Sequence, residues 1–278
     1  MKIAVITDSS AGVSQAQAAE YGIYVARMPL TIDGKEYIEE EGISRIELIA
    51  AMRRGAKVST SQPPLGVLIE TFESLLKEYD HVIFLPISSK LSGTYQTALG
   101  LASDFDNRIT VIDSQFVAAP LLLLSVDVKK MADMGMDPLK IKEKVEREAE
   151  MFAPLIPEDI QYLKRGGRIT PAAAAIANLL KIIPVLKVAN GEIDVLEKVR
   201  THKKALKVGF GHVFEGRNID EYEWIVLDGD CDPKTFESLV EDVEKHIGRP
   251  AVRELLYPIV LAHTGPGSIA LCAYKKLI

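Results

Sequence analysis

Four short polar motifs interrupt an otherwise apolar chain of 278 residues. In chain order they are Ser59-Thr60-Ser61-Gln62-Pro63, Ser88-Ser89-Lys90-Leu91-Ser92-Gly93-Thr94, Lys164-Arg165-Gly166-Gly167-Arg168 and His263-Thr264-Gly265-Pro266-Gly267. They supply hydroxyls, an imidazole, a guanidinium and free backbone N–H groups, which are the groups that proteins use to bind anions. The motifs therefore predict an anion site, with Thr60, Ser92, Arg168 and His263 as its candidate ligands.

Each motif taken alone also has a simpler structural interpretation. Ser92 lies between an expected strand and an expected helix, where serine often caps the helix. Thr60 comes shortly before two prolines and is expected in an extended loop. Arg168 alone is typical of a surface arginine, and His263 is typical of a core histidine at the end of a strand. The presence of all four motifs in one chain is what favours a shared site.

Several enzyme classes lack their sequence signature here. A hydrolase could use Ser92 as nucleophile and His263 as base, but the chain has no G-x-S-x-G turn. It also lacks the G-x-G-x-x-G and Walker A loops that bind dinucleotides and nucleotides. The five histidines are not at metal-ligand spacing. We therefore expect no catalytic residue, metal or cofactor, and a hydrolase or phosphate-handling enzyme built on Ser92 and His263 is the alternative.

The composition is that of an ordinary globular protein, with 47% hydrophobic and 26% charged residues. A formal net charge of −6 argues against nucleic-acid binding. The longest apolar runs, 116–124 and 171–177, are much shorter than the roughly 20 residues of a membrane helix, so no stable membrane insertion is expected. The two cysteines suit a reducing compartment, and the N-terminal apolar run is too short for a signal peptide. These features predict a cytoplasmic protein.

The first half of the chain alternates between strand and helix patterns. Strands are predicted at 1–6, 24–28, 29–32, 81–87 and 109–112, and helices at 15–21, 44–54, 65–79, 93–103, 116–134 and 138–152. This alternation predicts an α/β fold with a mostly parallel, doubly wound sheet. Ligands of such sheets bind at the carboxyl ends of the strands, where the polar segments 7–10, 88–94 and 113–114 fall.

The second half predicts a mixed or antiparallel sheet with helices. Asn190-Gly191 separates two apolar runs, 182–188 and 193–199, which is a strong hairpin signal. Further elements follow, namely helices at 201–213 and 233–246 and strands at 223–227, 259–262 and 269–274. We expect two α/β domains, residues 1–156 and 157–278, with a ligand site between them.

Two other segments have both a structural and a functional interpretation. Residues 171–180 form an apolar, alanine-rich helix pattern that suits either a packed core or a space for an apolar ligand tail. A basic patch suits either a solvated helix face or a docking surface for an acidic partner. It consists of Lys198, Arg200, His202, Lys203, Lys204 and Lys207.

The motifs, in this order and spacing, resemble those of the DegV family, bacterial fatty-acid-binding proteins that include the binding subunits of fatty acid kinase. The resemblance covers most of the chain. It is carried by Thr7-Asp8-Ser9-Ser10, Thr60-Ser61-Gln62-Pro63, Ser89-Lys90-Leu91-Ser92-Gly93-Thr94-Tyr95, Asp113-Ser114, Tyr162-Leu163-Lys164-Arg165-Gly166-Gly167-Arg168-Ile169, Asn190-Gly191, Lys198-Val199-Arg200 and His263-Thr264-Gly265-Pro266-Gly267.

The resemblance implies a long-chain fatty acid in a tunnel between the two domains. Thr60 and Ser92 would hydrogen-bond its carboxylate, with His263 nearby and Arg168 in the polar network. Arg200 would belong to the surface that meets a separate, ATP-dependent fatty acid kinase, whose acyl phosphate product can enter phospholipid synthesis. The chain would then bind and present its ligand without being an enzyme itself. A regulatory protein that only senses a lipid is a further alternative.

Overall fold

The computed structural model describes residues 1–177 and 181–278. Its first sheet is parallel, with the strand order β2-β1-β6-β7. The strands are β1 (Ile3–Asp8), β2 (Tyr24–Ala26), β6 (His81–Leu85) and β7 (Ile109–Val111). The predicted doubly wound sheet is thus confirmed. The polar segment 7–10 includes the carboxyl end of β1, and the segments 88–94 and 113–114 follow the carboxyl ends of β6 and β7.

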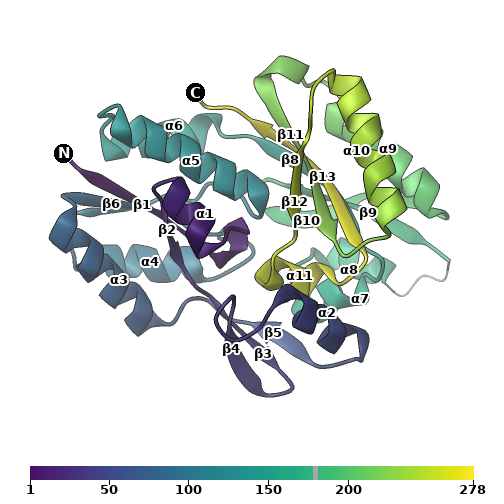
Figure 1. Cartoon of the computed structure of the whole chain (residues 1–278), viewed down its shortest axis with the longest axis horizontal. Coiled ribbons are helices and arrows are strands. Elements are labelled where there is room, and N and C mark those ends of the chain that lie inside the picture. The colour runs from purple at the N-terminus through teal and green to yellow at the C-terminus, as the bar shows by residue number, and fades with distance from the viewer. Residues whose placement is uncertain (178–180) are drawn as a thin grey trace.

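Helices cover both faces of this parallel sheet (Figure 1). Ile3 and Val5 face the core under α5 (Ala119–Asp133) and α6 (Pro138–Glu148), whereas Ala4 and Ile6 face the core under α3 (Leu65–Glu78) and α4 (Thr94–Ala102). Successive side chains of a strand point to opposite faces, so an apolar strand without alternation is buried on both sides. The continuous apolar runs of β1 and β6 are explained in this way.

A small antiparallel sheet, β4-β3-β5, lies beside the parallel sheet. It contains β3 (Pro29–Ile32), β4 (Lys35–Ile38) and β5 (Val58–Thr60), and the predicted Asp33-Gly34 turn is present, with both residues at positive φ. Thr60 was expected in a loop, but it ends β5 because this segment pairs with β3. Helix α2 (Arg45–Arg53) follows β4, and Arg45 Nη2 donates to the backbone oxygen of Asp228 at 2.9 Å.

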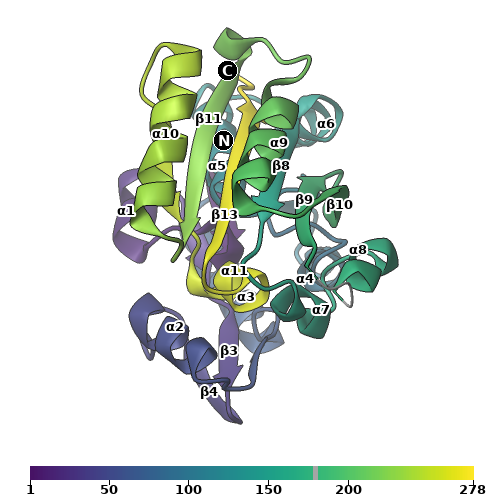
Figure 2. The same ribbon diagram turned by 90° about the vertical axis from the view of Figure 1, so that its right-hand side faces the viewer.

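The second large sheet is mixed, with the order β10-β9-β8-β13-β11-β12. Its strands are β8 (Met151–Ile156), β9 (Ile183–Ala189), β10 (Glu192–Val199), β11 (Tyr222–Gly229), β12 (Val252–Leu255) and β13 (Ser268–Lys275). The predicted β9–β10 hairpin is confirmed, and Asn190 (φ 51°) and Gly191 (φ 81°) adopt the positive φ values that its tight turn requires. Helices α9 (His202–Phe214) and α10 (Pro233–Ile247) lie side by side on one face of the sheet (Figure 2).

Several predicted elements differ from the structure. The strand predicted at 259–262 is wrong, because Pro258 begins helix α11 (Pro258–Thr264), and a short apolar run does not distinguish a strand from a buried helix. The helix predicted to reach residue 152 ends at Glu148, and β8 follows it. Because β8 pairs with β9 and β13, the sheets divide before residue 151, while the domain boundary after 156 stays a prediction.

The remaining short elements complete the chain. Ser14 caps α1 (Gln15–Glu20), and Asp8 caps the 3-10 turn η1 (Ser9–Ala11). Further elements are α7 (Gln161–Gly166), α8 (Pro171–Ile176) and η2 (Ile219–Glu221). Of the apolar segment 171–180, residues 178–180 lie outside the described residues. Across 1–177 and 181–278, no helix has the length and apolar character needed to cross a bilayer.

Candidate functional site

A narrow, mostly apolar cavity lies between the six-stranded sheet and the N-terminal elements. Its volume is about 80 Å³, several times the roughly 10–15 Å³ that one water molecule needs. One wall comes from the six-stranded sheet, with Met151, Ala153, Leu155, Leu227, Ala270 and Cys272. The opposite wall is formed by Met28, Ile87, Leu91, Val117 and Ala118. Such a shape suits a slender apolar molecule.

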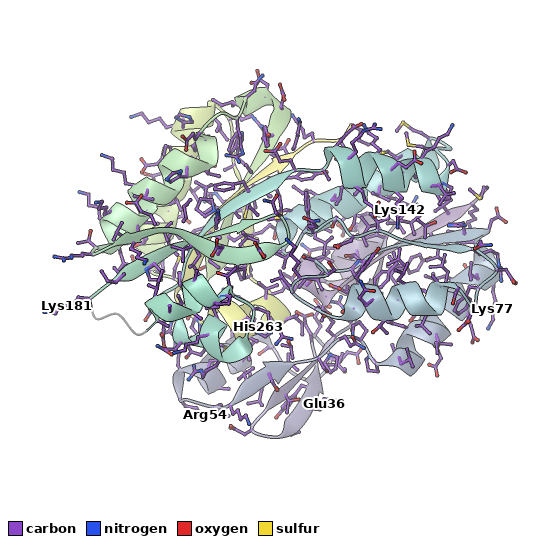
Figure 3. The ribbon with its side chains drawn as sticks, turned by 180° about the vertical axis from the view of Figure 1, so that it is seen from behind. Glu36, Arg54, Lys77, Lys142, Lys181 and His263 are labelled. Carbon is purple, nitrogen blue, oxygen red and sulfur yellow. The ribbon has the colours of Figure 1, made fainter. Side chains whose placement is uncertain are left out.

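Polar side chains from four separate motifs also line this cavity. Thr60 comes from the end of β5, Ser92 from the segment before α4, Arg168 from the turn after α7, and His263 from α11. Figure 3 shows that His263 lies in the interior of the molecule, whereas the labelled Lys181 and Lys77 lie at its periphery. The structure thus brings the four predicted anion ligands to one cavity. Arg200 lies outside it, exposed between β10 and α9.

His263 forms the centre of the polar cluster. Its Nε2 lies 2.7 Å from Thr60 Oγ1, so the helix α11 and the strand β5 meet at this hydrogen bond. On its other side the imidazole packs against the backbone of Gly166 at the end of α7, where a methyl group would overlap His263 Nδ1. The ring is therefore fixed between a hydroxyl and a glycine.

His263 is neutral at physiological pH. Burial, together with the nearby positive charge of Arg168, lowers the pKa of the imidazole to about 4. Among the described residues, the buried Nδ1 has no hydrogen-bond partner. A buried N–H without an acceptor is costlier than an unpaired acceptor, which favours the proton on Nε2. Nε2–H then donates to Thr60 Oγ1, and the Thr60 O–H is left to donate to an anion in the cavity.

The low pKa of His263 predicts that the stability of the protein without a bound ligand depends on pH. As the pH falls from about 6.5 to about 4, the unfolded chain takes up this proton before the folded chain does. Stability is therefore fully present above pH 6.5 and falls by about 3 kcal/mol towards pH 4. Urea unfolding at pH 7 and pH 4 should show this loss in the native protein and lack it in His263→Gln.

A second buried group titrates in the same range with the opposite sign. Burial raises the pKa of Glu39 to about 7, so its contribution to stability is lost as the pH rises from 4.5 towards 7. This contribution is common to the native protein and to His263→Gln, so it cancels when the two are compared. Equal pH dependence in both proteins would contradict the assignment to His263.

Ser92 and Arg168 are held by local hydrogen bonds. Ser92 Oγ lies 2.9 Å from Thr94 Oγ1 and accepts from the Thr94 N–H, in the turn that begins α4. Arg168 Nε donates to the Leu91 oxygen at 3.3 Å, and its Nη1 donates to the Gly166 oxygen at 2.5 Å. The guanidinium therefore joins the loop of Ser92 to the end of α7, and it brings a positive charge to the polar cluster.

Sequence reasoning missed three features of this site. Ser61 and Thr264 also line the cavity, although each lies directly beside a predicted ligand. The third feature is Gly166, which is the last residue of α7 and whose missing side chain admits the His263 ring. Only Gly167, at φ 68°, ends the helix in the left-handed conformation that favours glycine.

Comparison with known proteins places nearly the whole chain in one family. The protein-family sequence model described as "Uncharacterised protein, DegV family" matches residues 2–276 of this chain. The chain belongs to the DegV family. It is 33% identical to a DegV domain-containing protein of Streptococcus pneumoniae, with 98% of each chain covered.

Solved structures of DegV proteins share this architecture. A Thermus thermophilus DegV family protein, whose structure is described as showing fatty acid binding, matches with 29% identity and a TM-score of 0.88, over 99% of this chain and 100% of that one. DegV of Bacillus subtilis, described as a fatty acid binding protein, matches with 26% identity and a TM-score of 0.87, with the same coverage. The predicted two-part α/β fold is thereby confirmed.

Proposed function

We propose that this DegV protein binds a long-chain fatty acid in the cavity between its two large sheets. The acyl tail lies along the apolar walls, and the carboxylate is held by Thr60, Ser92 and His263, with Arg168 in a supporting role. The observation that carries the proposal is a narrow apolar cavity that includes one cluster of anion-binding groups. The fatty-acid-binding structures from Thermus thermophilus and Bacillus subtilis support the same ligand class.

The chemistry of the cavity suits a carrier that leaves its ligand reactive. Each buried CH₂ contributes about 0.8 kcal/mol, so a dozen methylenes contribute on the order of 10 kcal/mol before the costs of association. Affinity can therefore come from the tail, while neutral hydroxyls orient the head. Because neutral donors leave the carboxylate nucleophilic, we propose that a separate, ATP-dependent fatty acid kinase phosphorylates it to an acyl phosphate for phospholipid synthesis.

The alternative enzyme, with Ser92 as nucleophile and His263 as base, is less well supported. His263 Nε2 is hydrogen-bonded to Thr60, and Ser92 Oγ is hydrogen-bonded to Thr94. A catalytic serine needs the imidazole nitrogen within hydrogen-bond reach of its own hydroxyl. These two pairs leave Ser92 and His263 without a hydrogen bond to each other.

Mass spectrometry of small molecules released from the purified, untreated protein tests the ligand class. We expect a long-chain fatty acid at close to one molecule per chain. An empty protein that also fails to take up added fatty acid would refute the proposal. It would also turn attention to phosphate-containing ligands for the same polar cluster.

Charge reversal at Arg200 tests the proposed contact with the kinase. Arg200 is exposed and lies outside the cavity, so Arg200→Glu should leave fatty acid binding unchanged. Acyl phosphate formation with the cognate kinase should fall by about tenfold or more, because a like charge replaces an attractive one at the contact. Arg108→Glu, at an exposed position in the turn before β7, is the matched control. Normal turnover with Arg200→Glu would remove Arg200 from the contact.

A further inference from the structure

Helices α9 and α10 lie side by side on the outer side of the six-stranded sheet (Figure 2). A wide groove runs between them. Its volume is about 890 Å³. Each helix contributes one stripe of residues at helical spacing. The stripe of α9 is His202, Lys203, Leu206, Lys207 and Phe210, and that of α10 is Lys234, Thr235, Ser238, Leu239, Asp242, Lys245 and His246.

The groove has an apolar floor between cationic rims. Leu206, Phe210 and Leu239 form the floor, and His246 meets the Phe210 ring edge to face, with the ring centres 5.4 Å apart. The rims carry the exposed lysines Lys203, Lys207, Lys234 and Lys245.

The rim lysines are available to a partner. Among the described residues, none of the four forms an ion pair, and Asp242 is the one acidic residue that lines the groove. Positive charge is thus concentrated here on a chain whose formal net charge is −6. Four lysines around an apolar floor are complementary to a surface that is acidic at its edges and apolar along its centre.

This groove is separate from the proposed ligand cavity. In the six-stranded sheet, Leu227, Ala270 and Cys272 line the cavity. Their neighbours Val226 and Leu271 point to the opposite face, into the core beneath α9 and α10. The sheet therefore lies between the two sites. The groove is present whether or not a ligand occupies the cavity.

We propose that the α9–α10 groove docks an acidic, amphipathic helix of a protein partner. The stripe of α9 extends over about 12 Å, or roughly two helical turns, so a partner helix of similar length can place an apolar stripe on the floor. Glutamates on either side of that stripe would meet the lysines. The floor is recessed between two helices, which suits a convex helix better than a broad, flat lipid surface. The proposal goes beyond the Arg200 contact and does not depend on the cavity ligand.

A designed peptide provides the probe. A fluorescent 16-residue helix with a leucine stripe flanked by glutamates is titrated with the full-length protein, and anisotropy reports binding. We expect saturable binding that weakens with salt. We expect the double variant Lys207→Glu/Lys245→Glu to bind about tenfold or more weakly, because two attractive charges become repulsive. Lys140→Glu, at an exposed position on α6, serves as control and should bind normally.

Three results would overturn the proposal. One is equal binding of the acidic peptide to the double variant and the native protein. Another is equally tight binding of a matched peptide with lysines in place of glutamates, since this would show that charge plays no part. The third is binding of phosphatidylglycerol vesicles through Lys207 and Lys245 without peptide binding, which would assign the groove to a lipid surface. Fatty acid loading and circular dichroism of the double variant should match those of the native protein.

Discussion

Gly166→Ala is expected to destabilise the protein and to disrupt the proposed carboxylate site together. The added methyl group would overlap His263 Nδ1, so either the imidazole or the end of α7 must move. Overpacking of this kind costs about 1–3 kcal/mol of folding free energy. Displacement of the ring also breaks its hydrogen bond to Thr60, and we expect fatty acid affinity to fall by about tenfold or more.

Gly100→Ala is the matched control for this substitution. Gly100 also lies within a helix, α4, but an added methyl group there has no atom within 4 Å. Replacing a helical glycine by alanine normally stabilises a protein by up to about 1 kcal/mol. Thermal unfolding and fatty acid titration of both variants measure the difference. If Gly166→Ala is as stable and binds as tightly as Gly100→Ala, the ring is not held by this glycine.

The double variant Thr60→Val/Ser92→Ala is expected to lose recognition of the carboxylate and to keep the apolar cavity. Hydrogen bonds to a charged group contribute about 1.5–3 kcal/mol each, so the loss of both hydroxyls should weaken fatty acid binding by about a hundredfold or more. Thr60→Val keeps the size of the side chain but removes the hydroxyl that pairs with His263 Nε2. Isothermal titration with a saturated C16 acid is the measurement.

Comparison with the methyl ester of the same acid separates recognition of the head from binding of the tail. The native protein should prefer the acid to the ester, whereas the double variant should bind both with similar, weak affinity. Thr60→Ser retains a hydroxyl at the same position and should keep most of the preference. A double variant that still discriminates strongly between acid and ester would show that other groups hold the carboxylate.

The parallel and mixed types of the two large sheets could be predicted from local patterns in the sequence. The apolar runs of β1 and β6, separated by helical patterns, predict a parallel sheet, and Asn190-Gly191 predicts the β9–β10 hairpin. The carboxyl-end rule also placed Ser92 correctly, in the segment between the end of β6 and the start of α4. These predictions succeeded because local chemistry and the global fold favour the same structure.

The features that could not be predicted from the sequence depend on contacts between residues far apart in the chain. The run 259–262 is equally apolar as a strand or as a helix. In the structure it belongs to α11, which begins at Pro258 and packs against α2, α7 and β5. The short strand β5 depends on its pairing with β3, so Thr60 looked like a loop residue. The role of Gly166 depends on a side chain 97 positions later in the chain, and no local pattern reports such a contact.

The cavity lies within a single cluster of buried apolar residues that extends from Val5 and Leu85 of the parallel sheet to Leu155 and Cys272 of the mixed sheet. An acyl chain in the cavity would therefore complete the packing between the two sheets. The hydrophobic core would then include a ligand that can be exchanged for another. Binding to the folded state alone raises folding stability in proportion to the logarithm of ligand concentration. Resistance of this protein to proteolysis would then report the local supply of its ligand.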